Sequence, residues 1–231
     1  MLPHPTLTGD VPGDVTETLY AAIGQAVGFL GPTTLSDEPA AWIRRGSVLH
    51  AATFSTYRLW AALRVPQTLE AVRMALPEIH DTFDDDWAAL ADIALIVPLP
   101  QTGDDLFWEQ IRIVPQGVGV GQERDDPENW AIMVGRAVAV HLCLGDYMIW
   151  ATLNGHDQLL HCLFLASQTL DVPLSTLQER IPRLIPALLT AGVAYLDMVG
   201  VTAWDIAETP RDGPDSGPTP SRRAGQACAS S

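Results

Sequence analysis

The segment from residue 128 to residue 206 constrains the fold most, because most of its side chains are apolar. Residues 184–204 contain a single charged side chain, that of Asp197. A helix that is apolar on all sides suits either the centre of a helical bundle or a membrane. Charged side chains within the preceding apolar stretch, and a proline within this one, favour the bundle. The helices expected here span about 128–152, 157–170 and 174–204.

Capping residues, prolines and apolar spacing favour helices in the first half of the chain as well. These helices are expected at about 14–30, 36–65 and 67–76, with another after the acidic run at 84–86. Two β-type runs around a glycine-containing turn predict one β-hairpin at about 92–115.

The expected fold class is therefore mainly α, a helical bundle-like single domain over residues 14–206 with that one small β-hairpin and no internal repeat. An irregular N-terminus is expected at residues 1–13. Residues 207–231 are small, polar and rich in proline, which predicts a disordered C-terminal tail. Cys228 in this tail is expected to be an incidental exposed thiol.

All 13 basic side chains are arginine, so the chain contains no lysine. This excludes Schiff-base enzymes and P-loop nucleotide binding that depend on lysine. A net charge of −15 disfavours partners with a phosphate backbone and anionic membranes. The composition is typical of a GC-rich, actinobacteria-like source. A halophile is the alternative, although only 18% of the residues are charged. Three cysteines without framework spacing, and no secretory signal, indicate the cytoplasm.

One constellation consists of His50, the adjacent pair His80 and Asp81, and the distant Asp146. This order resembles that of the metal ligands in HD-type phosphohydrolases, an all-helical family. The resemblance implies that these four residues hold a divalent transition metal, which activates water against a phosphoester. Pro77 stands where the family has an uninterrupted helix. The alternative is a helix-capping aspartate beside a surface histidine.

A second constellation consists of arginine followed at short distance by histidine. The three pairs are Arg45 with His50, Arg136 with His141, and Arg73 with His80. They resemble the Arg-x4-6-His signature of the HEPN ribonucleases, a helical family, and the resemblance implies RNA cleavage at a dimer interface. The acidic chain offers little to attract RNA.

A third group combines zinc-binding residue types in one neighbourhood: His141, Cys143, His156, His161 and Cys162. Ligands on one helix should be three or four residues apart, whereas these are two or five apart, so the cysteines are also read as core residues. Residues 117–121, GVGVG, resemble a fragment of a phosphate-binding loop or form an ordinary glycine loop. Trp108 and Trp130 are the candidates for an exposed contact patch.

These observations favour a non-enzymatic cytosolic helical protein that acts through protein–protein contacts, as a dimer or as a subunit of a larger assembly, without a cofactor. The apolar segment at 128–206 is rich enough to supply an interface as well as a core. The alternative function is that of a metal-dependent HD-like phosphohydrolase.

Overall fold

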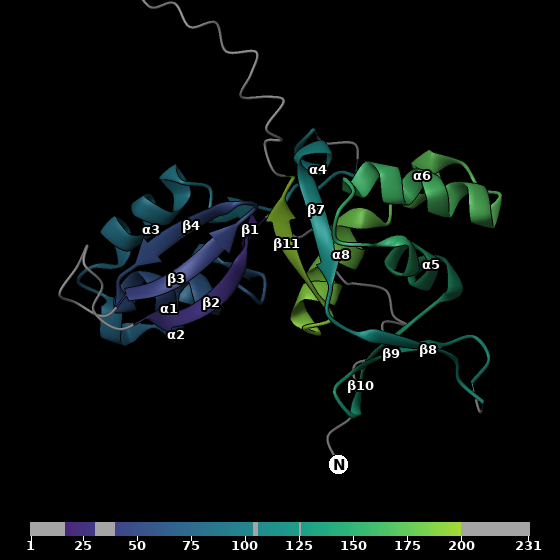
Figure 1. Ribbon diagram of the computed structural model, residues 1–231, viewed down its shortest axis with the longest axis horizontal. Helices are drawn as coiled ribbons and strands as arrows, with labels where there is room; N and C mark the ends of the chain where they lie inside the picture. Colours follow the sequence, from purple (N-terminus) through teal and green to yellow (C-terminus); the bar gives the residue numbers. More distant parts are fainter. Residues whose placement is uncertain (1–16, 31–39, 104–105, 125, 200–231) are drawn as a thin grey trace, which may run out of the picture. The chain divides into compact units, whose positions relative to one another are not determined.

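The computed structural model describes residues 17–30, 40–103, 106–124 and 126–199. It is a mixed α/β structure with 41% helix and 30% strand, and its described strands form small antiparallel sheets (Figure 1). The prediction of a mainly α, bundle-like fold is therefore wrong. The predicted irregular N-terminus, the predicted tail and Cys228 lie outside the described residues.

The first half of the described chain runs through strands, helices and a 3-10 helix up to residue 98. Its elements are β1 (Leu19–Ala22), β2 (Gln25–Leu30), β3 (Ala40–Arg45), β4 (Val48–Ala52), α1 (Phe54–Ala62), β5 (Gln67–Thr68), α2 (Leu69–Ala75), η1 (Pro77–Ile79), α3 (Phe83–Asp92) and β6 (Ile96–Pro98).

The second half begins with a short helix and ends with a buried strand. Its elements are α4 (Phe107–Gln110), β7 (Ile111–Pro115), β8 (Val118–Gln122), β9 (Trp130–Val134), β10 (Ala137–Leu142), α5 (Leu144–Thr152), α6 (Leu159–Leu170), α7 (Leu174–Gln178), α8 (Ile181–Thr190) and β11 (Ala194–Met198).

These halves follow the same plan. In each, a first strand leads into a three-stranded antiparallel meander, β2-β3-β4 or β8-β9-β10, and a helix follows at once. In each, a last helix leads into a strand that pairs antiparallel with the first, β6 with β1 and β11 with β7. We call residues 19–98 the N-terminal repeat and residues 111–198 the C-terminal repeat.

Backbone details support this equivalence. Ile23 donates its N–H to Leu95 O at 2.8 Å, and Gln116 donates to Val193 O at the same distance. The last helix of each repeat is followed, two residues after its end, by a residue with positive φ: Ala94 (48°) after α3 and Gly192 (67°) after α8. The same kind of helix end therefore precedes the last strand of each repeat, β6 or β11.

The first helices are equivalent in sequence too. Residues 54–63 read FSTYRLWAAL and residues 144–153 read LGDYMIWATL. The tyrosine and tryptophan ring centroids lie 5.7 Å apart for Tyr57 and Trp60 and 5.8 Å apart for Tyr147 and Trp150. The chain therefore contains an internal repeat that the sequence analysis missed.

Each repeat also has a hydrophobic core cluster. The N-terminal core is built around Trp60, Leu63 and Phe83, and the C-terminal core around Trp108, Ile132 and the helices α5 to α8. The repeats are joined by backbone pairing between Ile23 and Leu196.

Several predicted helices are strands. Residues 25–30 and 40–52 form the N-terminal meander, residues 130–142 form two strands of the C-terminal meander, and residues 194–198 form β11. The predicted hairpin at 92–115 is also wrong, because β6 and β7 each pair with a strand of their own repeat. The prediction at 157–170 is confirmed by α6. Within the described part of the chain, no helix is long and apolar enough to cross a membrane.

Candidate interaction surface

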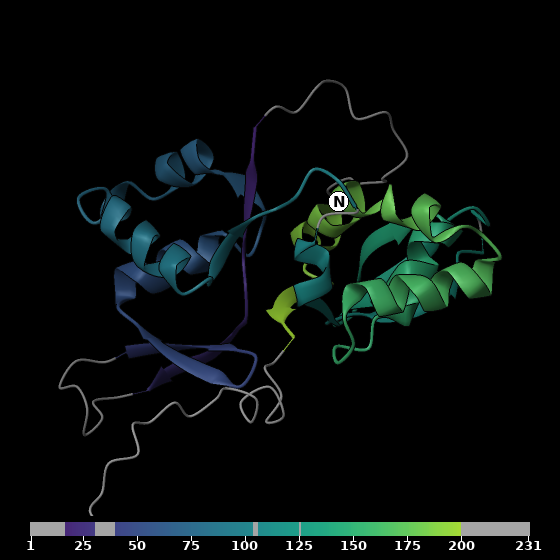
Figure 2. The same ribbon diagram turned by 90° about the horizontal axis from the view of Figure 1, so that it is seen from above.

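The N-terminal meander has one face covered by helices and one face that no described helix covers (Figures 1 and 2). Side chains alternate between the faces of a strand, so Ile43 is buried while its neighbours Trp42 and Arg44 lie on the opposite face. The register places Arg44 opposite Gln25 on β2 and Leu49 on β4. The residues that share this side form the N-terminal face: Gln25, Val27, Trp42, Arg44, Leu49 and Ala51.

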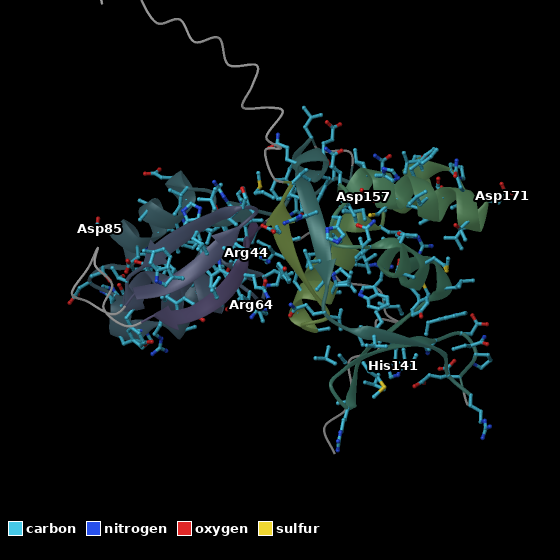
Figure 3. All side chains as sticks on the ribbon, viewed as in Figure 1. Arg44, Arg64, Asp85, His141, Asp157 and Asp171 are labelled. Carbon is cyan, nitrogen blue, oxygen red and sulfur yellow. The ribbon has the colours of Figure 1, made fainter. Side chains whose placement is uncertain are left out.

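A shallow hollow of about 540 Å³ runs across this face from β2 to β4. Two aliphatic side chains, Val27 and Leu49, line the hollow. Val27 is 53% exposed and Leu49 is 52% exposed. Arg44 lies between them on β3 (Figure 3). Its Nη2 donates to Gln25 Oε1 at 3.0 Å, and among the described residues it forms no ion pair. The face therefore combines exposed aliphatic surface with a positive charge that no described carboxylate neutralises.

The C-terminal meander has a corresponding face. Trp130 packs against Tyr147 of α5, with ring centroids 4.8 Å apart, so the neighbouring positions on β9 lie on the other side of the sheet. Figure 3 shows His141 on this side, away from α5. The residues that share it form the C-terminal face: Val118, Val120, Ala131, Met133, Val138 and His141.

The two faces agree in their aliphatic positions. Both β2 and β8 contain a register shift at which a valine is followed by a glycine with positive φ, and these are Val27 and Val120. Val120 is 52% exposed, close to the value for Val27. The C-terminal face has its own hollow, of about 240 Å³, which Val120 and Val138 help to line. Each of the two repeats thus places exposed aliphatic side chains beside a hollow.

The two faces differ in the side chain on their central strand. The position of Arg44 is occupied on β9 by Met133, when the strands are aligned on the glycines of the β3–β4 and β9–β10 turns. At the edge of the C-terminal face, His141 Nε2 and Glu123 Oε1 lie 2.8 Å apart. The Glu123 carboxylate therefore already has a partner, His141. Arg44 on the N-terminal face, in contrast, forms no ion pair with any described carboxylate.

A buried carboxylate holds together the helices behind the C-terminal meander. Asp146 in α5 accepts a hydrogen bond from Arg180 Nη1 and another from Arg183 Nη2, both at 3.0 Å. The hydrogen bond to Asp146 raises the pKa of Arg180, and burial opposes this effect. Since both carboxylate oxygens already accept hydrogen bonds from arginine, Asp146 serves as a structural tie between α5 and the start of α8.

The structure does not bring the proposed HD-type ligands together. His50 lies on β4, His80 and Asp81 are exposed after η1, and Asp146 is buried beside the two arginines. Burial, and then the charge of Arg45, lower the pKa of His50. Among the described residues, no group of three or more His, Cys, Asp or Glu side chains could hold a metal ion.

The arginines of the ribonuclease-like pairs have other roles or positions. Arg45 donates to Ile93 O, and Arg73 pairs with Asp84 at 2.5 Å. Arg136 lies in the turn between β9 and β10, whereas its expected partner His141 contacts Glu123.

The zinc-like group is dispersed over several elements. Cys143 is exposed at the start of α5, and Cys162 is buried in α6, where burial raises the pKa of its thiol. His156 and His161 are exposed. The glycines of residues 117–121 belong to β8 and the turn before it.

The two tryptophans expected to form a contact patch lie in different surroundings. Trp108 is fully buried, and its indole N–H donates to Thr102 O at 2.9 Å. Trp130 is half-buried against α5. A patch that exposes both rings is therefore incompatible with this structure.

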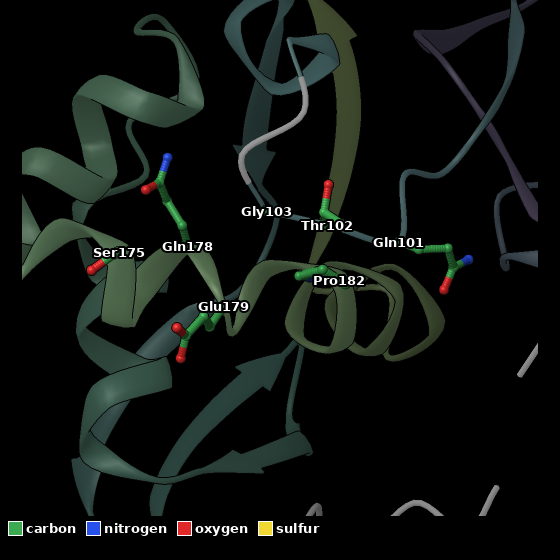
Figure 4. A pocket seen from close by; sticks show the side chains of 7 residues that line it. All are labelled: Gln101, Thr102, Gly103, Ser175, Gln178, Glu179 and Pro182. Carbon is green, nitrogen blue, oxygen red and sulfur yellow. The ribbon is translucent and has the colours of Figure 1, made fainter. Parts of the chain in front are cut away.

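Another hollow, of about 460 Å³, lies between the segment 101–103 and the helices α7 and α8 (Figure 4). The side chains of Gln101, Gln178 and Glu179 point in different directions rather than toward one centre (Figure 4). A catalytic site requires groups that converge on the reacting atoms, and these side chains do not.

Comparison with known protein families, with curated proteins and with solved structures gives no match for this chain. The residues of the two sheet faces are the candidate functional residues that the sequence reasoning missed. Their signal was present in the repeated FSTYRLWAAL and LGDYMIWATL segments, which mark the end of each meander.

Proposed function

We propose that this protein acts through protein–protein contacts made by the N-terminal and C-terminal faces, rather than by catalysis. The observation that carries the proposal is the exposure of aliphatic side chains beside a hollow at equivalent positions of both repeats. Exposed apolar surface is costly in water, and contiguous apolar patches mark interaction sites. Two such faces on one chain suit a dimer or a subunit of a larger assembly.

Single aspartate substitutions test this proposal. Leu49→Asp places a charge in the N-terminal face and Val138→Asp places one in the C-terminal face. Met74→Asp is the matched control, because Met74 is 71% exposed on α2 and lies on neither face.

Light scattering after size-exclusion chromatography measures self-association, and quantitative mass spectrometry after affinity capture from the source cells measures bound proteins. We expect the Leu49 and Val138 variants to lose self-association or a bound protein at least fivefold, about 1 kcal/mol, and the Met74 variant to retain it. A wild-type chain that is strictly monomeric at high concentration and captures no protein would refute the proposal. An equal loss in the Met74 variant would do the same.

We also propose that the protein works in the cytoplasm. Cys143 and Cys162 are free thiols, which suits a reducing compartment. Cell fractionation tests this location, and recovery of the protein with secreted markers would contradict it.

A further inference from the structure

The N-terminal face carries a more specific inference, which rests on the proposed function. We propose that this face binds an extended segment of a partner protein in which a carboxylate stands between two aliphatic side chains. The carboxylate pairs with Arg44, and the aliphatic side chains contact Val27 and Leu49.

The charge of Arg44 is the first argument. The chain contains 28 acidic residues and 13 basic ones, so acidic residues that could pair with a surface arginine are in excess. Arg44 nevertheless has no ion-pair partner among the described residues and donates instead to the neutral oxygen Gln25 Oε1. A guanidinium presents five N–H donors. The hydrogen bond to Gln25 uses only one of the guanidinium nitrogens of Arg44, Nη2. The remaining donors suit a planar carboxylate.

The arrangement across the three strands is the second argument. Val27, Arg44 and Leu49 lie on β2, β3 and β4 in that order, and all three line the same hollow. Neighbouring strands lie about 4.8 Å apart, so the two outer strands are separated by roughly 10 Å. An extended peptide advances about 3.3 Å per residue and turns every second side chain to the same side, so five residues, roughly 13 Å long, present three side chains to the face. A carboxylate at the third residue then meets Arg44, with aliphatic side chains at the first and fifth.

The C-terminal face supplies the contrast within the same molecule. It keeps the exposed valine at the register shift, Val120, but has Met133 in place of Arg44. Its nearby carboxylate, Glu123, already pairs with His141. Arg124 also lines the C-terminal hollow, but Met133 lies on the central strand there, between the aliphatic side chains of the outer strands. The preference for a carboxylate between two aliphatic side chains therefore belongs to the N-terminal face.

A random dodecapeptide phage-display library provides the probe. It is selected in parallel on the immobilised full-length wild type, on Arg44→Glu, on Arg44→Met and on Met74→Asp as the control. Wild type and the control should enrich Asp or Glu with aliphatic residues two positions before and two positions after it. Arg44→Glu should enrich Lys or Arg in the same place, and Arg44→Met should retain the aliphatic residues without a charge preference.

Synthetic peptides taken from the selection give the affinity by fluorescence anisotropy. The acidic peptide should bind wild type at least tenfold more tightly than its Asp-to-Lys analogue, and Arg44→Glu should reverse this order. Leu49→Asp should weaken both peptides at least tenfold. Melting curves of each variant confirm that the chain still folds.

Enrichment without an acidic position, no enriched peptide, or the same selection on Arg44→Glu would overturn the inference. So would a change in self-association on Arg44→Glu without any change in peptide selection, because the face would then be an interface between copies of this chain. If the inference fails while Leu49→Asp still releases a bound protein, the proposed function stands with a partner of different chemistry. If neither effect is seen, both fail.

Discussion

Replacing Asp197 with alanine should lower the free energy of unfolding by about 3–5 kcal/mol, the range for breaking a buried ion pair. Asp197 on β11 is only 1% exposed. Its Oδ2 accepts a hydrogen bond from Arg112 Nη2 at 2.5 Å, and its Oδ1 accepts one from the backbone N–H of Gly46 at 2.7 Å. The substitution leaves a largely buried guanidinium without its carboxylate and two backbone donors, the N–H groups of Gly46 and Met198, without their acceptor. Gly46 belongs to the other repeat, so the contact between repeats weakens as well.

Urea unfolding followed by tryptophan fluorescence measures the loss directly. For a chain of this length the melting temperature should fall by roughly 2–4 °C per kcal/mol. The double variant Asp197→Leu with Arg112→Met removes both charges and should recover most of the stability, because buried pairs are often replaceable by apolar residues. The equivalent position, directly after the N-terminal repeat, is already the buried Leu99. A loss below about 1 kcal/mol in Asp197→Ala, or a double variant no more stable than the single one, would refute this reasoning.

Three further predictions concern other positions. Gly24→Ala should destabilise the chain by more than about 1 kcal/mol. The φ angle of Gly24 is +95°, and the added Cβ would lie 2.4 Å from Arg44 O. Urea unfolding that does not differ from that of the wild type would contradict this prediction. His50 has a lowered pKa in the folded chain, owing to burial and then the charge of Arg45, so the unfolded chain binds its proton more readily. Stability should therefore fall as pH drops below about 6.5 and level off below the folded pKa, and His50→Gln should lose this part of the pH profile. Iodoacetamide at pH 8, with peptide-level mass spectrometry, should label the exposed Cys143 much faster than Cys162, whose pKa is raised by burial; equal rates would contradict the burial of Cys162.

The helices of this fold could be predicted from the sequence where the apolar spacing is long and regular, as in α6. The strands could not, because they are short and apolar on both faces. Residues 137–142 read AVAVHL, and a run of that kind fits a buried helix as well as a strand. Pairing decides between the two, and β10 pairs with β9 across a two-residue turn. The closing strands depend on partners far away in the sequence, since β6 pairs with β1 and β11 with β7.

The candidate site was missed for a related reason. Which side chains of a meander face outward depends on strand register, and a helical assignment scatters the same residues around a cylinder. Leu49 and Val27 became neighbours only through the pairing of β2, β3 and β4. The residues proposed as metal ligands show the opposite case. Their order along the chain matched a known pattern, but His50 lies on a strand and Asp146 is tied to two arginines.

The two repeats hold their helices together at the same place with opposite chemistry. In the N-terminal repeat, Asp86 of α3 accepts hydrogen bonds from the hydroxyls of Thr56 in α1 and Thr82 just before α3. In the C-terminal repeat, the carboxylate is Asp146 of α5, and the donor just before α8 is Arg180.

Buried polar groups can change in this way as long as each remains satisfied. An exposed side chain is free of that constraint, although β-branched residues such as valine favour strands. Val27 and Val120 nevertheless keep the same identity, the same register shift and nearly the same exposure. The contact with a partner that we propose would account for aliphatic residues at both positions, and Met133 at the position of Arg44 would separate what that contact requires of each face.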